Sequence, residues 1–171
     1  RGAIGDALLA EGHGLLLYNM RGQPETSFTP GTSLDMDLVV ADAMALLGFV
    51  APTRPVYVGL SIGGLFAAHV HLLGTPCVGL AFINTLRRDG PRLEWINSSV
   101  TRAAEIGGPA LMMDLMTPLL FDEPWLRANR AEAFDSANYQ PIDQSSGAYS
   151  LLANGRTADW DIDWNALTMP A

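Results

Sequence analysis

A serine that could act as a nucleophile lies in the stretch Gly59-Leu-Ser-Ile-Gly63, between an apolar run and a series of small residues. Serine attacks a carbonyl group efficiently when a sharp turn from a strand into a helix exposes its hydroxyl. Such a turn needs small neighbours, and we expect a Cβ at Gly59 or Gly63 to clash across it. The backbone N–H of Ile62 opens the helix and is placed to donate to an oxyanion, helped by the helix dipole. The pattern predicts nucleophilic catalysis by Ser61, with Ile62 in the oxyanion hole.

Other interpretations of these residues stay open at this point. The stretch could be a glycine-rich structural turn with an inert serine. The spacing Gly59-x-Ser61-x-x-Gly64 also approaches the dinucleotide-binding fingerprint. That fingerprint requires a glycine where Ser61 stands, and an Asp or Glu where the next strand ends at Asn84. A phosphate-binding loop would need Gly-Lys followed by Ser or Thr, which the sequence lacks.

A serine nucleophile requires a histidine that takes its proton and an acid that orients the histidine. The sequence has three histidines. We expect His13, which precedes the first predicted strand, to lie on the surface. His69 lies eight residues along the helix from Ser61, or about 12 Å, so it cannot fold back onto the serine, and His71 is farther still. Their spacing of two directs the rings to different faces, which disfavours a shared metal site, and we expect no metal or organic cofactor.

Alternating apolar runs and helical patterns predict the elements that hold this turn. Residues 15–19, 56–60 and 77–83 are short apolar runs typical of buried parallel strands. Helical patterns occur over 4–11, after a cap at Thr32 or Ser33, and over 62–73. The order predicts an α/β fold: a mostly parallel sheet joined by right-handed crossovers, with helices on both faces.

Residues 90 to about 153 contain helical patterns and no strand pattern, which indicates a helical lid inserted after the third strand. The patterns cover 92–106, 110–120, 123–134 and 144–152. The apolar, methionine-rich stretch 111–121, together with Trp95 and Trp125, could line a site for variable acyl chains or pack against the core. We divide the chain into a core with the serine turn (1–85), a lid (86–157) and a return to the core (158–171).

Composition restricts the partners of the chain. Its 171 residues are 49% hydrophobic and carry a net charge of −8. The acidity disfavours nucleic acid and anionic membranes as partners, since both attract basic patches. No apolar run reaches the ~20 residues of a membrane span, and the single cysteine, Cys77, permits no intrachain disulfide. We expect a cytoplasmic protein and predict no oligomeric state.

The chain resembles the α/β-hydrolase superfamily over nearly its whole length. Asn19-Met-Arg-Gly22 is similar to the start of the family pattern Asp-x-Arg-Gly-x-Gly-x-Ser, from which the chain departs at Asn19, Pro24 and Thr26. Gly59-Leu-Ser-Ile-Gly63 is similar to the family's nucleophile turn. Phe82-Ile-Asn-Thr85 is similar to the Leu-x-Asn-Thr of enol-lactonase-like members, and a lid follows.

The resemblance implies a partial α/β-hydrolase fold and a serine hydrolase of the lid-bearing esterase or enol-lactonase-like branch. It implies cleavage of a small hydrophobic carboxylic ester, thioester or lactone through an acyl-enzyme at Ser61. A cofactor-free perhydrolase, a C–C bond hydrolase and a non-catalytic small-molecule receptor are alternatives on the same fold. Ser61 disfavours dehalogenation, for which relatives carry Asp at this position.

The resemblance also predicts that the chain is a fragment lacking both ends, because it has no base for Ser61. In the family the acid and the histidine would follow Ala171, and a second oxyanion donor would precede Arg1. Asp89, the nearest acid after the third predicted strand, we expect to be a solvated loop residue. A strand before Arg1 would separate 15–19 from 56–60, so we expect those two segments to share no ladder and the isolated chain to be inactive.

Overall fold

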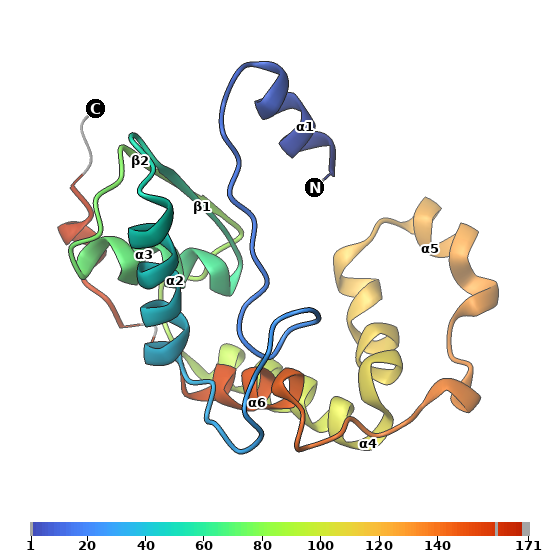
Figure 1. The fold of residues 1–171 in the computed structure, drawn as a ribbon. Coiled ribbons are helices and arrows are strands. Elements are labelled where there is room, and N and C mark those ends of the chain that lie inside the picture. The colour runs from blue at the N-terminus through green and yellow to red at the C-terminus, as the bar shows by residue number, and fades with distance from the viewer. Residues whose placement is uncertain (1, 160, 169–171) are drawn as a thin grey trace.

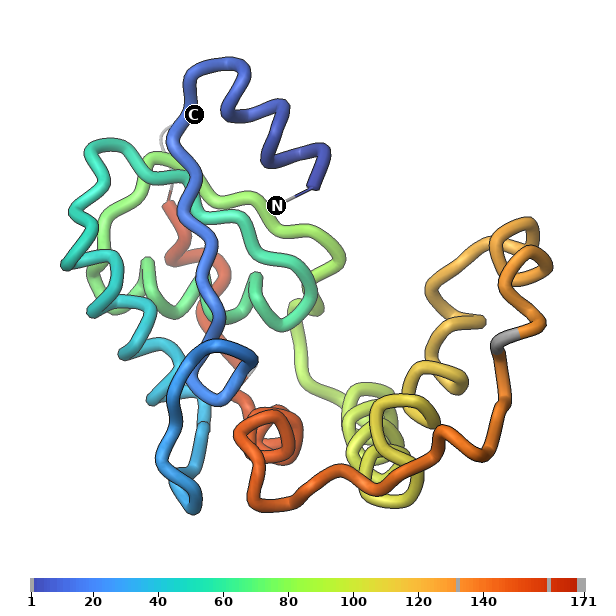
Figure 2. The backbone as a smooth tube through the Cα atoms, turned by 45° about the vertical axis from the view of Figure 1, so that its right-hand side comes forward, coloured from blue at the N-terminus to red at the C-terminus, as the bar shows by residue number. Residues whose placement is uncertain are grey.

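The structure is a computed structural model that describes residues 2–159 and 161–168 (Figure 1). A small parallel sheet and its helices form one part, and a helical arm extends away from it (Figures 1 and 2). The strands are β1 (Val56–Leu60) and β2 (Gly79–Ile83). The α-helices are α1 (Gly2–Ala10), α2 (Met36–Val50), α3 (Ile62–Leu72), α4 (Pro91–Leu120), α5 (Glu123–Asn129) and α6 (Gly147–Asn154). Short 3₁₀ turns cover Arg130–Glu132, Ser136–Asn138, Gly155–Thr157 and Trp164–Ala166.

The unit β1–α3–β2 positions the serine turn. The strands are parallel and pair without a bulge, from Val56 opposite Gly79 to Leu60 opposite Ile83. Helix α3 connects them and packs against α2 through a cluster of Val40, Ala43 and Val70. The predicted order of helices and parallel strands is therefore confirmed in this part of the chain.

A second hydrophobic cluster joins α3 to the arm and to the segment that returns from it. Its buried members are Leu65, Leu93 and Ala158. The opposite face of the sheet is less covered, since Val56, Val58 and Leu60 are each more than half exposed. The described elements thus do not bury both faces as the α/β pattern predicts.

The prediction of a strand over 15–19 is wrong for this structure. The segment is irregular backbone, and Leu16, Leu17 and Tyr18 are exposed. A β-strand exists through hydrogen bonds to a neighbouring strand. Within the described residues no strand lies beside 15–19, so its apolar sequence is not enough. The third predicted strand begins at Gly79 rather than at Cys77. Val78 precedes the strand, and its N–H donates to the Pro55 carbonyl, just before β1.

Helix α2 begins later than predicted. Its N-cap is Asp35, whose carboxylate accepts a 3.0 Å hydrogen bond from the Leu38 backbone N–H. The expected caps, Thr32 and Ser33, instead lie against α6: the Ser150 hydroxyl donates to the Thr32 carbonyl, and the Ser33 hydroxyl bonds Asn154. The two residues that the local pattern assigns to the cap therefore contact α6, and Asp35 caps the helix.

The arm follows the predicted helical segments with two differences. The segments 92–106 and 110–120 are the two halves of α4, separated by a kink at Gly108, which has φ 66°. Glycine adopts this conformation without steric cost, and Pro109 cannot donate its own hydrogen bond. The third segment stays α-helical only to Asn129, and the fourth forms α6 three residues later than predicted. The domain boundaries at 85/86 and 157/158 stay predictions. Among the described residues no helix is both long and apolar enough to cross a membrane.

Candidate active site

Ser61 forms a sharp turn between β1 and α3. Its backbone lies at φ 54°, ψ −123°, and the residue is exposed. Residues other than glycine rarely adopt positive φ, and such conformations cost about 1–3 kcal/mol each. The strand, the strained serine and the helix follow one another without an intervening loop, which is the geometry that presents a serine hydroxyl for nucleophilic attack.

Backbone hydrogen bonds from the end of β2 hold the turn. The Ser61 N–H donates to the Ile83 carbonyl at 2.9 Å, which continues the pairing of β1 and β2 by one step. The Ser61 carbonyl accepts from the Gly64 N–H at 3.1 Å and from the Thr85 hydroxyl at 2.9 Å. The Ile62 N–H lies at the first position of α3, where a helix offers no intrahelical acceptor. Its assignment as an oxyanion donor stays a prediction.

Two glycines permit the close approach, and one of them is not the predicted one. A Cβ at Gly59 would overlap the backbone of Gly64 and Gly63, as expected for a tight turn. A Cβ at Gly63 would meet no heavy atom within 4 Å, so the predicted clash there is wrong. A Cβ at Gly64 would overlap the Thr85 side chain, so the steric requirement falls on Gly64. The helix directs Gly64 towards Thr85, whereas Gly63 points into open space.

None of the three histidines has a described hydrogen bond to Ser61. His69 Nε2 lies 3.3 Å from the Asp159 carbonyl oxygen, and His71 Nδ1 lies 3.4 Å from the Cys77 sulfur. His13 is exposed. In the described ranges no histidine hydrogen-bonds to Ser61, and no cluster of His, Cys, Asp and Glu side chains could hold a metal ion.

Asp89, the first acidic residue after β2, is exposed and accepts a 2.7 Å hydrogen bond from the Gly90 N–H of its own loop. A carboxylate that faces solvent and caps its neighbour has no visible tie to the serine turn. The structure therefore places neither a base nor an acid beside Ser61 among the residues it describes.

A cavity of about 350 Å³ lies at the end of β2, beside Thr85, whose hydroxyl bonds the Ser61 carbonyl. It is lined by Phe82, Thr85, Arg87, Trp164 and Leu167. The rings of Phe82 and Trp164 meet edge to face with centroids 5.6 Å apart, and Trp164 Nε1 donates to the Arg87 carbonyl. The motif Phe82-Ile-Asn-Thr85 assigns Thr85 no role of its own, although its hydroxyl contacts the backbone of Ser61.

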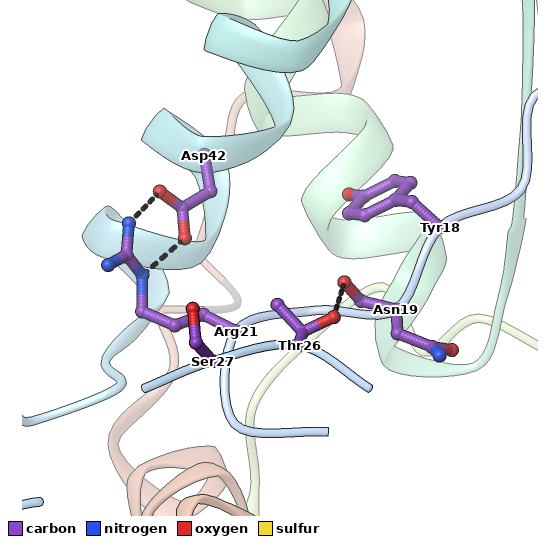
Figure 3. A pocket seen from close by; sticks show the side chains of 6 residues that line it. All are labelled: Tyr18, Asn19, Arg21, Thr26, Ser27 and Asp42. Carbon is purple, nitrogen blue, oxygen red and sulfur yellow. Dashed lines mark hydrogen bonds and ion pairs between the residues drawn. The ribbon is translucent and has the colours of Figure 1, made fainter. Parts of the chain in front are cut away.

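A second cavity, of about 290 Å³, lies beside the Asn19-Met-Arg-Gly22 motif and α2 (Figure 3). Arg21 donates to both carboxylate oxygens of Asp42, at 2.8 and 2.6 Å. These hydrogen bonds hold the pKa of Asp42 below its usual range. Tyr18 lines the same cavity, where partial burial of its otherwise exposed ring raises its pKa and the nearby Asp42 charge adds to that effect.

The Asn19 backbone carbonyl accepts from the Thr26 hydroxyl (Figure 3). The Asn19 side chain donates to the Pro24 carbonyl. Both bonds stay within the loop that begins at this motif, and the Arg21–Asp42 pair ties that loop to α2. The motif therefore has a structural role in the observed fold, and no residue of the serine turn lines this cavity.

A parallel β–α–β unit with a sharp turn at Ser61, followed by a helical arm, places the chain in the α/β class of folds. The model of the alpha/beta hydrolase family matches residues 4–167, and the chain belongs to that family. The fold is also similar to that of a thermophilic esterase from Thermogutta terrifontis, solved in a malate-bound form, with a TM-score of 0.64 and 23% identity. The match covers 89% of this chain and 57% of the esterase chain. No curated protein matches the chain.

These comparisons confirm the resemblance that the sequence motifs indicated and the predicted fold class. At 23% identity the likeness to the esterase shows the fold. The chain spans little more than half of the esterase's length, so activity and substrate belong to the proposal that follows.

Proposed function

We propose that Ser61 is the nucleophile of a hydrolase that cleaves a carboxylic ester, thioester or lactone. The observation that carries this proposal is the conformation of Ser61, a non-glycine residue at φ 54° on an exposed turn. Glycine would adopt this backbone without strain, so a purely structural turn has no need of a serine here. A residue with a strained backbone and an exposed side chain is instead typical of a functional group held for reaction. Membership of the alpha/beta hydrolase family supports the same chemistry.

The proposed reaction proceeds through an acyl-enzyme. Ser61 Oγ attacks the carbonyl carbon while a base removes the hydroxyl proton. The negative charge that develops on the carbonyl oxygen accepts a hydrogen bond from the Ile62 N–H. The tetrahedral intermediate collapses, the alcohol or thiol leaves with a proton, and water then hydrolyses the acyl-serine. The base and its acid stay predicted beyond Ala171, because His69 and His71 contact other groups and His13 is an exposed residue.

Exposed apolar side chains on the arm favour a hydrophobic substrate. Leu119, Leu120, Phe121 and Trp125 lie where α4 ends and α5 begins, and all four are at least 40% exposed. The rings of Phe121 and Trp125 stack with centroids 4.0 Å apart. An apolar platform of this kind suits an acyl or alkyl chain rather than a charged group.

Ser61→Ala tests the proposal in the protein as its gene encodes it. Hydrolysis of p-nitrophenyl acetate and butyrate should fall by roughly a thousandfold or more, as for other serine nucleophiles. Ser99→Ala, at an exposed serine of α4, is the matched control and should leave the rate unchanged. A fluorophosphonate probe should label the peptide that contains Ser61.

Turnover that survives in Ser61→Ala would overturn the assignment. A wild-type protein that binds small molecules without hydrolysing any ester would instead be a receptor. The 171-residue chain, assayed alongside, should be inactive because none of its described histidines hydrogen-bonds to Ser61. Turnover by that chain, abolished by Ser61→Ala, would contradict the missing-base prediction while supporting Ser61.

A further inference from the structure

We propose that Thr85 is a positioning residue that fixes the direction of the oxyanion-binding N–H, an inference that rests on the proposed function. Thr85 lies two residues beyond β2, and its hydroxyl donates a 2.9 Å hydrogen bond to the backbone carbonyl of Ser61. The contact is to the main chain of the nucleophile and leaves the Ser61 hydroxyl untouched. Thr85 therefore acts through the backbone of the turn rather than on the substrate.

The peptide unit between Ser61 and Ile62 links this contact to the chemistry. A trans peptide is planar, with its C=O and N–H pointing in opposite directions. The carbonyl that Thr85 holds and the Ile62 N–H assigned to the oxyanion belong to the same plane. A group that fixes the carbonyl thus fixes the direction of the N–H. A donor on the carbonyl also polarises the peptide and strengthens its N–H as a donor.

The position of Thr85 depends on a second left-handed residue. Asn84, directly after β2, has φ 52°, and asparagine is one of the residues that tolerate this region. The chain turns there, and the Thr85 hydroxyl reaches back to the serine turn. Ile83 and Thr85 together hold both main-chain polar groups of Ser61, the N–H and the carbonyl, from the end of β2.

An outside anchor is needed because Ser61 is strained. A residue in a sparsely populated backbone region keeps its conformation only where its surroundings over-determine it. The Gly64 N–H also donates to the Ser61 carbonyl, but it belongs to the same turn and would move with it. The Thr85 hydroxyl comes from the segment that follows β2, so it fixes the carbonyl relative to the end of the sheet. Gly64 leaves the room for it, since a Cβ there would overlap Thr85 Oγ1.

Thr85→Val tests the inference because it removes the hydroxyl and keeps the side-chain volume. In the enzyme as its gene encodes it, kcat for a p-nitrophenyl ester should fall roughly fivefold, the effect of one neutral hydrogen bond, with KM unchanged. Thr85→Ser keeps the hydroxyl and should restore kcat to within about twofold. A boronic acid that forms a tetrahedral adduct with the serine should bind Thr85→Val more weakly by the same factor, which a change in folding stability alone would not produce.

Thr101→Val is the matched control. The Thr101 hydroxyl also donates to a backbone carbonyl, that of Asn97 in α4, and removing it should leave kcat and boronate affinity unchanged. If Thr85→Val does not fold, Thr85→Ala and Thr85→Ser form a second pair that differs only in the hydroxyl. Of that pair, only the alanine variant should lose kcat.

Four outcomes separate the possibilities. Wild-type kcat and boronate affinity in a folded Thr85→Val enzyme would overturn the inference. A raised KM with unchanged kcat would also overturn it, because Thr85 would then contact the substrate. Turnover that persists in Ser61→Ala would remove the proposed function itself, and with it any role of Thr85. An inactive Ser61→Ala beside an unaffected Thr85→Val would remove the Thr85 inference alone.

Discussion

Alanine substitutions at the adjacent residues Gly63 and Gly64 should have opposite effects on stability. Both glycines lie in the first turn of α3, so alanine gains the same helix propensity at each, up to about 1 kcal/mol. At Gly63 the new methyl group meets no heavy atom within 4 Å, so Gly63→Ala should stabilise the protein by that amount. At Gly64 it would overlap Thr85 Oγ1 and lie 2.8 and 2.9 Å from Thr85 Cγ2 and Cβ.

The overlap at Gly64 cannot be relieved by a simple rotation. Oγ1, Cγ2 and Cβ of Thr85 all crowd the methyl position, and Oγ1 is bonded to the Ser61 carbonyl. Overpacking of a well-packed site costs about 1–3 kcal/mol. Because the propensity gain is common to both variants, the difference between them isolates this overlap. We therefore expect Gly64→Ala to be about 1–3 kcal/mol less stable than Gly63→Ala.

Urea unfolding followed by circular dichroism at 222 nm measures the free energy of unfolding of each variant against the wild type. Equal m-values would show that only stability has changed. Gly59→Ala serves as the upper reference, because its methyl group would overlap backbone atoms of Gly64 that cannot swing aside. If Gly64→Ala proves as stable as Gly63→Ala, the placement of Thr85 against α3 is wrong. If both destabilise equally, the requirement extends to Gly63, as the sequence motif alone predicts.

Two further predictions concern α2. Asp35→Ala removes the N-cap and should lower the free energy of unfolding by about 1 kcal/mol, whereas Asp37→Ala, in the first turn without a capping role, should cost less; equal losses in urea unfolding would argue against the cap. The Arg21 hydrogen bonds lower the pKa of Asp42, so this pair stabilises the fold above the ordinary carboxylate pKa of about 3.9, and that stability is lost as the pH falls through the lowered folded-state pKa. The stability difference between wild type and Asp42→Asn, at most about 1 kcal/mol for a partly exposed pair, should therefore shrink below about pH 4, and a pH-independent difference from pH 2 to 7 would contradict the assignment.

The serine turn was predictable because its determinants are local. An apolar run ends at Leu60, the serine follows, and small residues begin the next helix. These features lie within about ten positions, and each acts on backbone conformation or close packing at its own place. The strand, turn and helix accordingly occur where the sequence predicts them, with α3 ending one residue early.

The strand predicted over 15–19 shows what local pattern cannot supply. Its apolar composition is the same kind of evidence that correctly located β1 and β2. A strand additionally needs a partner at hydrogen-bonding distance, and that is a property of the surrounding fold rather than of the segment. β1 and β2 provide this for each other through the α3 crossover, while 15–19 has no such neighbour among the described residues.

Helix α2 is capped by Asp35, and the two residues predicted to cap it contact a distant part of the chain. Thr32 and Ser33 are good capping residues, and so is Asp35 three positions later. Local propensity does not decide among them. Contacts from Ser150 and Asn154 of α6 engage the first two, and Asp35 is the residue that bonds the helix. These partners are more than a hundred residues away in sequence, so no local pattern could rank the candidates.

The conformation of the serine turn likewise depends on both local and distant residues. Five residues suffice to predict that a serine sits on a sharp turn, but they do not show what keeps it strained. That support comes from Ile83 and Thr85, 22 and 24 positions later, and it changes which glycine matters. The motif emphasises Gly63, whereas the contact with Thr85 falls on Gly64, because the helix directs Gly64 towards that side chain. Local residues thus encode the shape of the strained turn, and distant residues encode its stability. Thr85, which stabilises the turn, also orients the peptide on which the proposed chemistry depends.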